Sequence, residues 1–375
     1  MPNPVRILHV VHRMQRGGIE TWLMHVLRNI DRDRYRFDFA VFTNEPCAYD
    51  NEIRSLNSRI IPCIPPERDL AHIRDIRRVL VSEEPYDVIH VHGSSAMGAA
   101  VKIASIVGVP IRIAHSHTAP GNFRRRTRSY FLRLITYYWL MKHMTHGLGV
   151  SQAACDHLFG ATWRNDKRCQ VLHLGLDWSP YRESMNVSAI REGLGIPVDA
   201  LVLGHVGRFH PVKNHEFFFM VAKRVIARHP NTYLLLVGDG DLLPVMKMRA
   251  QQLGIDDQVI FTGLRPDVYR LLQAMDVFLL PSRFEGLSLV LLEAQSVGLP
   301  CVISDRVAPE AVVMKELVTT LALDLSPEYW AEQVLQASRC KRQEQHRCAW
   351  NTMSQSQFSI ENCVRKLIAI YSSSA

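Results

Sequence analysis

The chain has 375 residues, of which 47% are hydrophobic and 21% charged, and these are values of a globular protein long enough for two domains with full cores. Its 44 lysines and arginines outnumber its 36 aspartates and glutamates, which gives a net charge of +8. This surplus favours an anionic partner such as a nucleotide diphosphate or an acidic lipid surface. A nucleic acid is disfavoured, because no basic motif with interleaved aromatic residues appears.

Cysteine usage and hydropathy bear on the compartment. The eight cysteines are scattered without a Cys-x-x-Cys pair, which is typical of reduced thiols in a cytosolic protein. The N-terminus leads into an expected strand without the apolar run of a secretion signal. No stretch reaches the ~18 apolar residues of a spanning helix. We therefore expect a cytoplasmic protein that can rest on the inner face of the cytoplasmic membrane.

Short apolar runs alternate with longer helical patterns, which predicts a parallel α/β architecture. In the first half of the chain the expected strands are Ile7–Val11, Phe37–Phe42, Val88–Val91, Ile111–Ala114 and Gly147–Val150. The helices expected between them include Ile73–Val81 and Met97–Val107.

The pattern breaks at Asp177–Pro197, a polar stretch with two prolines that we interpret as a linker. The C-terminal stretch Gln357–Tyr371 is amphipathic and is expected to be a helix that crosses back onto the first domain. The sequence thus predicts two doubly wound domains, residues 1–178 with 357–375 and residues 179–356. Strands of the second domain are expected at Leu201–Val206, Thr232–Val237, Gln258–Phe261, Val277–Leu280 and Pro300–Ile303.

An acidic pair follows the expected strand Val277–Leu280. Glu285 lies on the loop after the strand, and Glu293 lies inside the next helix. That loop is at the carboxyl edge of the sheet, where ligands bind, and the free N–H groups of the helix suit a diphosphate. Eight helical residues rise about 12 Å, farther than the roughly 5.5 to 9.5 Å between the carboxylates of a glycosidase. Two separate tasks on one ligand are therefore favoured over hydrolysis.

Both carboxylates also have a simpler interpretation, as solvated surface groups. Glu293, however, stands among Val290, Leu291, Leu292 and Ala294. A carboxylate in apolar surroundings needs a polar partner, and ribose hydroxyls would serve.

Two cations follow the first strand of the second domain. Arg208 comes directly after Gly207, and Lys213 comes five residues later, before a helix. This arrangement is suited to an anion, although a solvated basic loop is the alternative. Gly17-Gly18 follows the first strand of the chain and permits a tight turn close to a phosphate. The motif is not Gly-x-Gly-x-x-Gly, which disfavours a dinucleotide-binding domain of that kind.

Histidines stand in two pairs at alternate positions, His90 with His92 and His115 with His117. The members of each pair share one face of a strand. Zinc needs three or four ligands, and no further ligand stands at a typical spacing, so no metal site is expected. Most such histidines are hydrogen-bonded near a sheet edge. One or two of the four are expected to reach the substrate, with His117 as our choice.

The segment 123–140 is basic and aromatic, with Arg124-Arg125-Arg126 near its start and Tyr137-Tyr138-Trp139 near its end. Two interpretations are open. It can be an interfacial helix that meets anionic lipid, or a core helix of the first domain with a charged outer end.

Together these motifs resemble the retaining glycosyltransferases of family 4, which have the GT-B fold, and the resemblance covers nearly the whole chain. The Glu285–Glu293 block is its most specific part. Ala114–Thr118 is similar to the capsule and exopolysaccharide subgroup. One motif departs from the family, since His173 to Asp177 lacks the asparagine of Asn-Gly-Ile/Val-Asp. The remaining motifs are Gly17–Glu20, Asp87–His92, Gly149–Ser151, Val206–Arg208 with Lys213, Gly238–Gly240, Phe261–Gly263, Leu280–Ser282 and Gly298–Pro300.

The resemblance implies two Rossmann-like domains that face each other across a cleft, and a role for each motif. Arg208 and Lys213 would neutralise the donor diphosphate, and Glu293 would hold the ribose. His117 would line the sugar-transfer site, and Gly17-Gly18 would approach phosphate and acceptor. No metal and no other cofactor would be needed. The donor sugar would be held by Glu285 and the amides of Gly286, Leu287, Ser288 and Leu289.

The resulting hypothesis is a retaining hexosyltransferase that moves a sugar from a nucleotide diphosphate, expected to be UDP, to a lipid-linked glycan in cell-surface polysaccharide synthesis. A nucleotide-sugar epimerase or a phosphorylase of the same fold is one alternative, although a phosphorylase would be a much longer chain. A non-catalytic scaffold of a polysaccharide assembly complex is another. The presence of both glutamates, the arginine and the lysine disfavours the scaffold.

Overall fold

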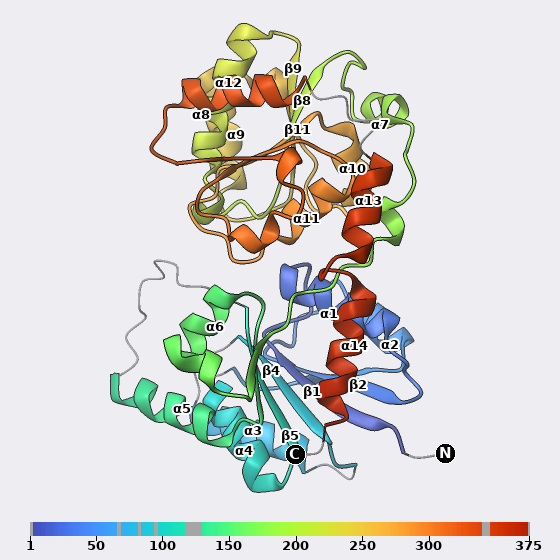
Figure 1. Cartoon of the computed structure of the whole chain (residues 1–375), viewed down its shortest axis with the longest axis vertical. Coiled ribbons are helices and arrows are strands. Elements are labelled where there is room, and N and C mark those ends of the chain that lie inside the picture. The colour runs from blue at the N-terminus through green and yellow to red at the C-terminus, as the bar shows by residue number, and fades with distance from the viewer. Residues whose placement is uncertain are drawn as a thin grey trace. The chain divides into compact units, whose positions relative to one another are not determined.

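The computed structural model describes residues 3–65, 69–81, 84–93, 97–117, 130–339 and 346–373. The chain divides into two compact units. Unit 1 consists of Met1–Asp177 and Gln357–Ala375, and unit 2 of Trp178–Ser356. Each unit contains one parallel sheet with helices packed on its two faces (Figure 1). The predicted α/β class with two doubly wound sheets is confirmed.

The sheet of unit 1 has the order β3-β2-β1-β4-β5-β6-β7, and its neighbouring strands pair in parallel. The middle strands are almost wholly buried and mainly apolar, and the histidines that they contain are buried with them. The two edge strands were not predicted because they are very short. The strands are β1 (Val5–Val11), β2 (Tyr35–Val41), β3 (Arg59–Pro62), β4 (Val88–His92), β5 (Ile111–Ser116), β6 (His146–Gly149) and β7 (Cys169–Val171).

The C-terminal helix of the chain belongs to unit 1, as predicted. In Figure 1, α14 (red) lies beside α1 (blue), although the two are far apart in the sequence. The indole Nε1 of Trp22 on α1 donates a hydrogen bond to Sγ of Cys363 on α14, 3.3 Å away. The helices of this unit are α1 (Gly18–Asn29), α2 (Asp50–Ser55), α3 (Asp69–Leu80), α4 (Met97–Val107), α5 (Tyr130–His143), α6 (Gln152–Phe159) and α14 (Ile360–Tyr371).

The sheet of unit 2 has the order β10-β9-β8-β11-β12-β13, again with parallel pairs. The chain order reverses between β8 and β11, so the loops after these strands form the ligand-binding edge in open sheets of this kind. Its strands are β8 (Leu201–Val206), β9 (Thr232–Val237), β10 (Val259–Phe261), β11 (Val277–Leu280), β12 (Cys301–Ser304) and β13 (Val318–Leu321). Its helices are α7 (Val187–Gly193), α8 (His215–Arg228), α9 (Leu243–Leu253), α10 (Val268–Ala274), α11 (Leu289–Ser296), α12 (Pro327–Ala337) and α13 (His346–Gln355).

The interpretation of Asp177–Pro197 as a linker is wrong. The segment contains a 3₁₀ turn, Ser179–Tyr181, and helix α7, and from Trp178 onward it is part of unit 2. Arg191 of α7 is buried and donates hydrogen bonds to the carbonyls of Ala274 and Val198 and to Asp276. A polar composition here therefore reflects helix capping and a buried arginine, and not a free connection.

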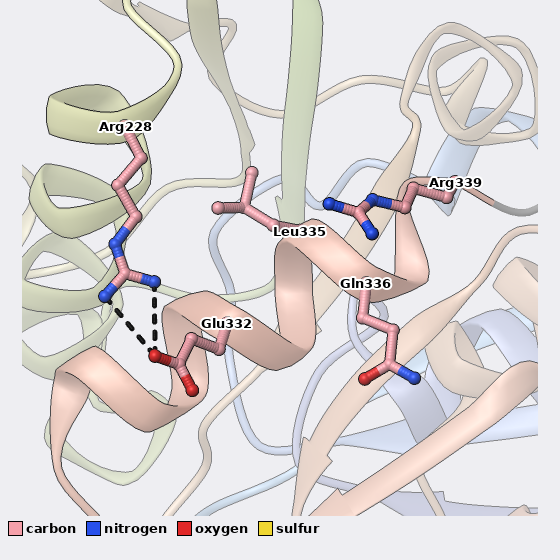
Figure 2. Close-up of a pocket in the computed structure, with 5 residues that line it drawn as sticks. All are labelled: Arg228, Glu332, Leu335, Gln336 and Arg339. Atoms are coloured by element: carbon pink, nitrogen blue, oxygen red, sulfur yellow. Dashed lines mark hydrogen bonds and ion pairs between the residues drawn. The ribbon is translucent and has the colours of Figure 1, made fainter.

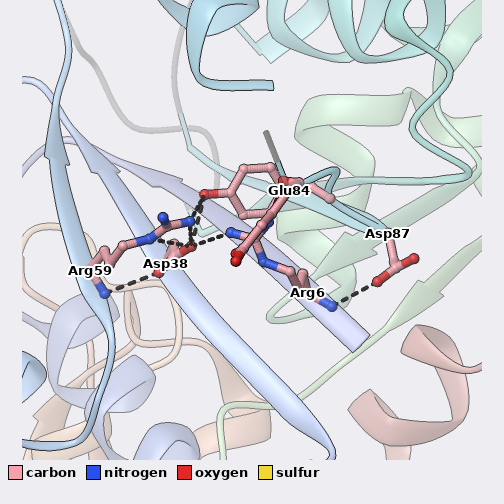
Figure 3. A network of polar contacts seen from close by, with 6 residues as sticks. Arg6, Asp38, Arg59, Glu84 and Asp87 are labelled. Atoms are coloured by element: carbon pink, nitrogen blue, oxygen red, sulfur yellow. Dashed lines mark hydrogen bonds and ion pairs between the residues drawn. The ribbon is translucent and has the colours of Figure 1, made fainter. Parts of the chain in front are cut away.

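A polar network holds the strands of unit 1 together at the amino ends of β1, β3 and β4 (Figure 3). Asp38 accepts hydrogen bonds from Arg6 at 3.1 Å, from Arg59 at 2.7 Å and from the Tyr86 hydroxyl at 2.8 Å. Burial raises the pKa of this carboxyl, but the hydrogen bonds from Arg59 and Tyr86 outweigh it and hold the pKa below its usual range. The network joins three strands through one buried carboxylate.

The basic, aromatic segment 123–140 is described only from residue 130 onward, where helix α5 begins. Residues 123–129 of the segment lie outside the described residues. Leu140 of α5 is buried in the core of unit 1, whereas Leu134, Tyr137 and Tyr138 are exposed. The helix therefore has both a core face and an exposed apolar face. Within the described ranges, no helix has both the length and the apolar character needed to cross a bilayer.

Candidate functional site

Three loops meet at the carboxyl edge of the unit 2 sheet, and glycines let them pack against one another. Gly238 follows β9 with a φ of +139°, and a Cβ there would lie 2.1 Å from the carbonyl oxygen of Gly207. Gly240 has a φ of +152°, and its Cβ would lie 2.7 Å from the Phe209 oxygen. No other residue type fits at these positions, because the backbone of the loop after β8 occupies the space.

Arg208 stands on this loop, directly after β8. Its side chain is exposed, and among the described residues it forms no ion pair and no hydrogen bond. Its Cγ lies 3.0 Å from the position that a Cβ on Gly240 would occupy, so the first part of the side chain packs against the loop after β9. The guanidinium is thus available for a bidentate contact with a phosphate.

Lys213 lies close to the same turn and pairs with the first glutamate. Its Nζ donates to Oε1 of Glu285, and the Ser282 hydroxyl donates to the same oxygen at 3.1 Å. Both side chains of the ion pair are largely buried, with relative exposures of 19% and 13%. Asn214, in the left-handed conformation with φ 57°, donates to the Pro281 carbonyl at 3.1 Å and joins the loops after β8 and β11.

The first turn of α11 offers unused hydrogen-bond donors. The amides of residues 286–290 donate to no acceptor within the described part of the chain. The N-cap residue Ser288 makes no capping bond, and its buried hydroxyl has no partner among the described residues. Helix geometry leaves the first four amides without an intrahelical acceptor, and the helix dipole adds a partial positive charge. This end of α11 can therefore receive anionic or hydroxyl oxygens.

Glu293 lies within α11 and has a different partner from Glu285. The hydroxyl of Tyr181 donates to its Oε1 at 2.5 Å. Burial raises the pKa of Glu293 to about 7, although the bond from Tyr181 lowers it. The predicted need of this carboxylate for a polar partner is thus met by a tyrosine in the segment that was interpreted as a linker. The two glutamates have separate partners.

The other predicted site residues lie in unit 1. Gly17 is the N-cap of α1, and a Cβ on it would lie 2.4 Å from the carboxylate of Glu20. A phosphate that approached Gly17 and Gly18 would have to share this helix end with Glu20.

His117 follows β5 and belongs to a cluster of five histidines, defined here as His9, His90, His92, His115 and His117. The first four are buried, and His117 is partly exposed. The rings pair with one another: His9 with His92 at 3.0 Å, His92 with His117 at 3.0 Å and His90 with His115 at 3.1 Å. Sequence spacing predicted two separate pairs, but β1, β4 and β5 are neighbours, and they bring both pairs together with His9.

All five imidazoles of this cluster are neutral near pH 7. Burial lowers the pKa of His9 and of His117 to about 3, and it lowers the pKa of the other three well below the usual value. Each neutral imidazole has one donor and one acceptor nitrogen. The expectation that these histidines are hydrogen-bonded near a sheet edge is confirmed, and the partners are mostly other imidazoles.

A surface hollow of about 340 Å³ lies elsewhere on unit 2 (Figure 2). It is lined by Arg228, Glu332, Leu335, Gln336 and Arg339. Arg228 is the last residue of α8, a helix that begins at the carboxyl edge, so the hollow lies toward the amino edge of the sheet. An ion pair of 3.5 Å between Arg228 and Glu332 crosses it, and it contains none of the predicted site residues.

Comparisons with known proteins define the class. Residues 17–175 match the glycosyl transferase 4-like domain, and residues 186–354 match glycosyl transferases group 1. EpsF of Bacillus subtilis (strain 168), a protein named as a glycosyltransferase, is 32% identical over 369 residues, which are 98% of this chain and 96% of EpsF. The chain is therefore a glycosyltransferase, and it belongs to the family of group 1 enzymes with a family 4-like first domain.

A second relative is the UDP-Gal:alpha-D-GlcNAc-diphosphoundecaprenol alpha-1,3-galactosyltransferase of Escherichia coli. It is 30% identical over 263 residues, which are 66% of this chain and 67% of that enzyme. Among solved structures, Anabaena Alr3699/HepE in complex with UDP and glucose has a TM-score of 0.81 at 20% identity, with 98% of this chain and 100% of HepE covered. WaaG, a glycosyltransferase involved in lipopolysaccharide biosynthesis, has a TM-score of 0.73 at 18% identity, with 98% and 99% covered. These likenesses show the GT-B fold.

Proposed function

We propose that this glycosyltransferase moves a hexose from a UDP-sugar to a lipid-linked glycan in the synthesis of a capsule, an exopolysaccharide or a related surface glycan, with retention of the anomeric configuration. The observation that carries the proposal is the set of groups at one sheet edge of unit 2. Within the described part of the chain, it combines an arginine without an ion pair, a lysine paired with a glutamate, and amides at the start of α11 that donate to no acceptor.

In this proposal the donor diphosphate lies against Arg208 and Lys213. Bond cleavage at the anomeric carbon develops negative charge on the leaving diphosphate, and the two cations with the α11 dipole stabilise it without a metal. The ammonium of Lys213 is held by Glu285, so it is already oriented before the donor binds. Preorganised charge of this kind lowers the barrier because little reorganisation is needed during the reaction.

The two glutamates hold the two ends of the donor. Glu285, with the amides of Gly286, Leu287, Ser288 and Leu289, binds hydroxyls of the sugar. Glu293 binds the ribose hydroxyls, which would take the place of the Tyr181 hydroxyl or share the carboxylate with it. In unit 1, His117 lines the transfer site, and Gly17-Gly18 approaches phosphate and acceptor.

The names of the relatives support the choice of donor and acceptor. The E. coli relative is named for UDP-Gal and for a diphosphoundecaprenol acceptor, and HepE was crystallised with UDP and glucose. The assignment to capsule or exopolysaccharide synthesis rests on the similarity of Ala114–Thr118 to that subgroup.

A panel of nucleotide sugars tests the proposal. We expect a UDP-hexose to raise the melting temperature more than other nucleotide sugars, and the same donor to label a membrane lipid extract in a transfer assay. A larger response to nicotinamide nucleotides would overturn the donor class. Donor consumption without an acceptor would indicate an epimerase, and binding without any transfer would indicate a scaffold.

The exposed face of α5 supports contact with an anionic membrane surface in the same proposal. Tyr138 is 58% exposed, and Leu134 and Tyr137 lie on the same helix with exposures of 48% and 43%. Lys142 lies 5.5 Å from the Tyr138 ring, so apolar and cationic groups stand together, as in interfacial helices. The protein is expected to sediment with vesicles that contain anionic lipid and not with neutral ones. The variant Tyr138→Ser should bind them less, and equal binding by that variant would exclude this face.

A further inference from the structure

The histidine cluster of unit 1 contains more donor atoms than the proposed transfer uses. Two groups of three histidines could each hold a metal ion, because one ring nitrogen of each member lies within 4.8 Å of those of the other two. The first group is His9, His90 and His92, and the second group is His92, His115 and His117. The second group lies at the carboxyl ends of β4 and β5, and His117 is its partly exposed member.

Two ring nitrogens in the second group have no partner among the described residues. They are Nε2 of His115 and Nδ1 of His117, and both are buried. A buried ring nitrogen without a partner is destabilising, because it has lost its hydrogen bond to water. Hydrogen bonding among the rings therefore leaves part of the cluster unsatisfied, and a ligand that accepts lone pairs would remove this cost.

The far nitrogens of two of these rings are already held by other histidines. Nε2 of His92 lies 3.0 Å from Nδ1 of His9, and Nδ1 of His115 lies 3.1 Å from Nε2 of His90. His90 is held in turn by the hydroxyl of Tyr371, at 2.9 Å. Imidazoles that bind metals in proteins almost always donate their other N–H in this way, which sets the tautomer and directs the lone pair to the ion.

The first group lacks this arrangement. Both nitrogens of His90 have partners outside the group, one in His115 and one in Tyr371, so a metal would break one of these bonds. In the second group, the bond between described residues that a metal would displace joins two of its own members, His92 and His117.

The geometry points to a transition-metal site formed by Nδ1 of His92, Nε2 of His115 and one ring nitrogen of His117, with zinc as its expected ion. An imidazole–zinc bond is about 2.0–2.1 Å, so ligand nitrogens in a tetrahedral site stand roughly 3.4 Å apart. For binding through Nε2 of His117, which lies 3.0 Å from Nδ1 of His92, these two nitrogens need to separate only by a few tenths of an ångström. Three protein ligands leave the fourth position for water or for an oxygen of a ligand.

The surroundings suit a neutral three-imidazole site. The indole of Trp22, which is fully buried, stands at 89° to His115 and 70° to His92, with ring centroids 5.3 and 5.9 Å apart. This site belongs to unit 1, whereas the diphosphate contacts proposed above belong to unit 2. The two proposals share His117, but Zn²⁺ affinity is measured without the donor, so each proposal can fail without the other.

Metal binding to the whole chain tests the inference. After treatment with a chelator and its removal, the protein should bind one Zn²⁺ per chain by calorimetry. Its Co²⁺ complex should have the visible spectrum of a four-coordinate nitrogen and oxygen site, without the near-ultraviolet charge-transfer band of a thiolate. His117→Gln should weaken Zn²⁺ binding by more than tenfold. His90→Gln should weaken it by about 10- to 100-fold, because it removes the group that orients His115.

The matched control is His143→Gln, a partly buried histidine of unit 1 that contacts Ser105 and is not part of the cluster. It should bind Zn²⁺ as the unaltered protein does. His117 lies beyond the end of β5, so its variant is expected to fold even if variants within the strands do not, and circular dichroism checks this. Absence of stoichiometric binding by the unaltered protein would overturn the site, and so would equal affinity of His117→Gln or a thiolate band with Co²⁺.

Discussion

The two units have the same kind of parallel sheet, but the carboxyl edge of one contains neutral side chains and that of the other contains charged ones. In unit 1 the edge of β4 and β5 contains neutral imidazoles that bind one another. In unit 2 the loops after β8 and β11 contain Arg208 and the ion pair of Lys213 with Glu285. The location of the groups explains the difference, since most of the histidines stand on buried strands, whereas the charges stand on loops.

The comparison teaches that a Rossmann-like sheet does not determine the chemistry of its own edge. Burial removes charge from a group that can lose a proton, and the five histidines illustrate this. Arg208, by contrast, is an exposed guanidinium on a loop, and a guanidinium suits a phosphate. The charged edge is therefore the better candidate for a diphosphate.

The largest expected effect is that of Arg208→Ala at the charged edge. Loss of this cation should lower kcat/KM by roughly 10²-fold or more, about 3 kcal/mol of transition-state stabilisation, because one preorganised group that faces the leaving charge is removed. Steady-state kinetics with the donor found in the nucleotide-sugar panel measures it.

The matched control is Arg228→Ala, which removes the same side chain from the hollow toward the amino edge of unit 2. It should leave kcat/KM within twofold. Unaltered turnover in both Arg208→Ala and Lys213→Ala would mean that the diphosphate is not bound at this edge.

The next largest effect is expected from loss of the polar network around Asp38 in unit 1. Asp38→Ala should lower the free energy of unfolding by about 3 kcal/mol, because it leaves Arg6 and Arg59 without their shared carboxylate. The pKa of Asp38 is depressed, so this stabilisation is present at neutral pH and is lost as the pH falls through the pKa of the folded state. Denaturant unfolding at pH 7 and at acidic pH measures both.

An exposed ion pair of the same unit is the control. Glu52→Ala breaks a pair with Arg28 in which both side chains are over a third exposed, and it should cost less than about 1 kcal/mol. Donor affinity should not change in either variant, since both residues lie in unit 1 and the proposed diphosphate contacts lie in unit 2. A large loss of donor affinity in Asp38→Ala would contradict the division of tasks between the units.

A smaller effect is expected where the loops after β8 and β9 pack together. Gly238→Ala places a Cβ against the carbonyl of Gly207, so the loop must shift, at a cost of about 2 kcal/mol, and donor affinity should fall several-fold. Gly254→Ala is the control, because Gly254 also has positive φ, +66°, but open space surrounds its Cβ position. If both variants bound donor equally, close packing of these loops would not be needed for the site.

The smallest effect concerns the pH dependence of donor binding. The pKa of Glu293 is raised to about 7, and we expect the ribose to prefer the carboxylate, so the donor KM should rise as the pH falls below 7. Tyr181→Phe removes the hydrogen bond that lowers this pKa, so the rise should begin at higher pH, by less than about one pH unit. A KM profile that is flat between pH 6 and 8 would exclude ribose binding by Glu293.

Protonation of Glu293 also affects stability. Because its pKa is raised on folding, the folded state binds more protons than the unfolded state between about pH 4.5 and 7. The contribution of this group to stability is therefore present below that range and is lost as the pH rises through it. Tyr181→Phe should make the loss larger, which thermal unfolding at pH 5 and pH 8 would show.

Much of the fold was predictable because the buried parallel strands are mainly apolar. Strands β1, β8 and β9 begin and end within two residues of the predicted positions. Strands β3, β7 and β13 were missed, since three or four residues with little apolar content leave no periodic signal. The linker prediction failed because a capped short helix and a disordered connection have similar polar composition.

The candidate site was only partly predictable. The order Glu285, α11, Glu293 follows from spacing alone, since a strand, a loop and a helix determine where each carboxylate stands. Tyr181 could not be found in this way, because its contact with Glu293 spans 112 positions. His9 carried no signal either, since it stands alone among the apolar residues Ile7–Val11 of β1.

Hydrophobic periodicity was enough to predict two parallel α/β domains and the loops that contain charge, and the resemblance of the motifs to a known family was enough to predict the family. All of these depend on short stretches of chain. The pairing of Tyr181 with Glu293, the availability of Arg208 and the gathering of five histidines arise only when strands distant in the sequence become neighbours. Burial and the proximity of polar groups are properties of that packing, and they determine which side chains are neutral, which are paired and which remain available to a ligand.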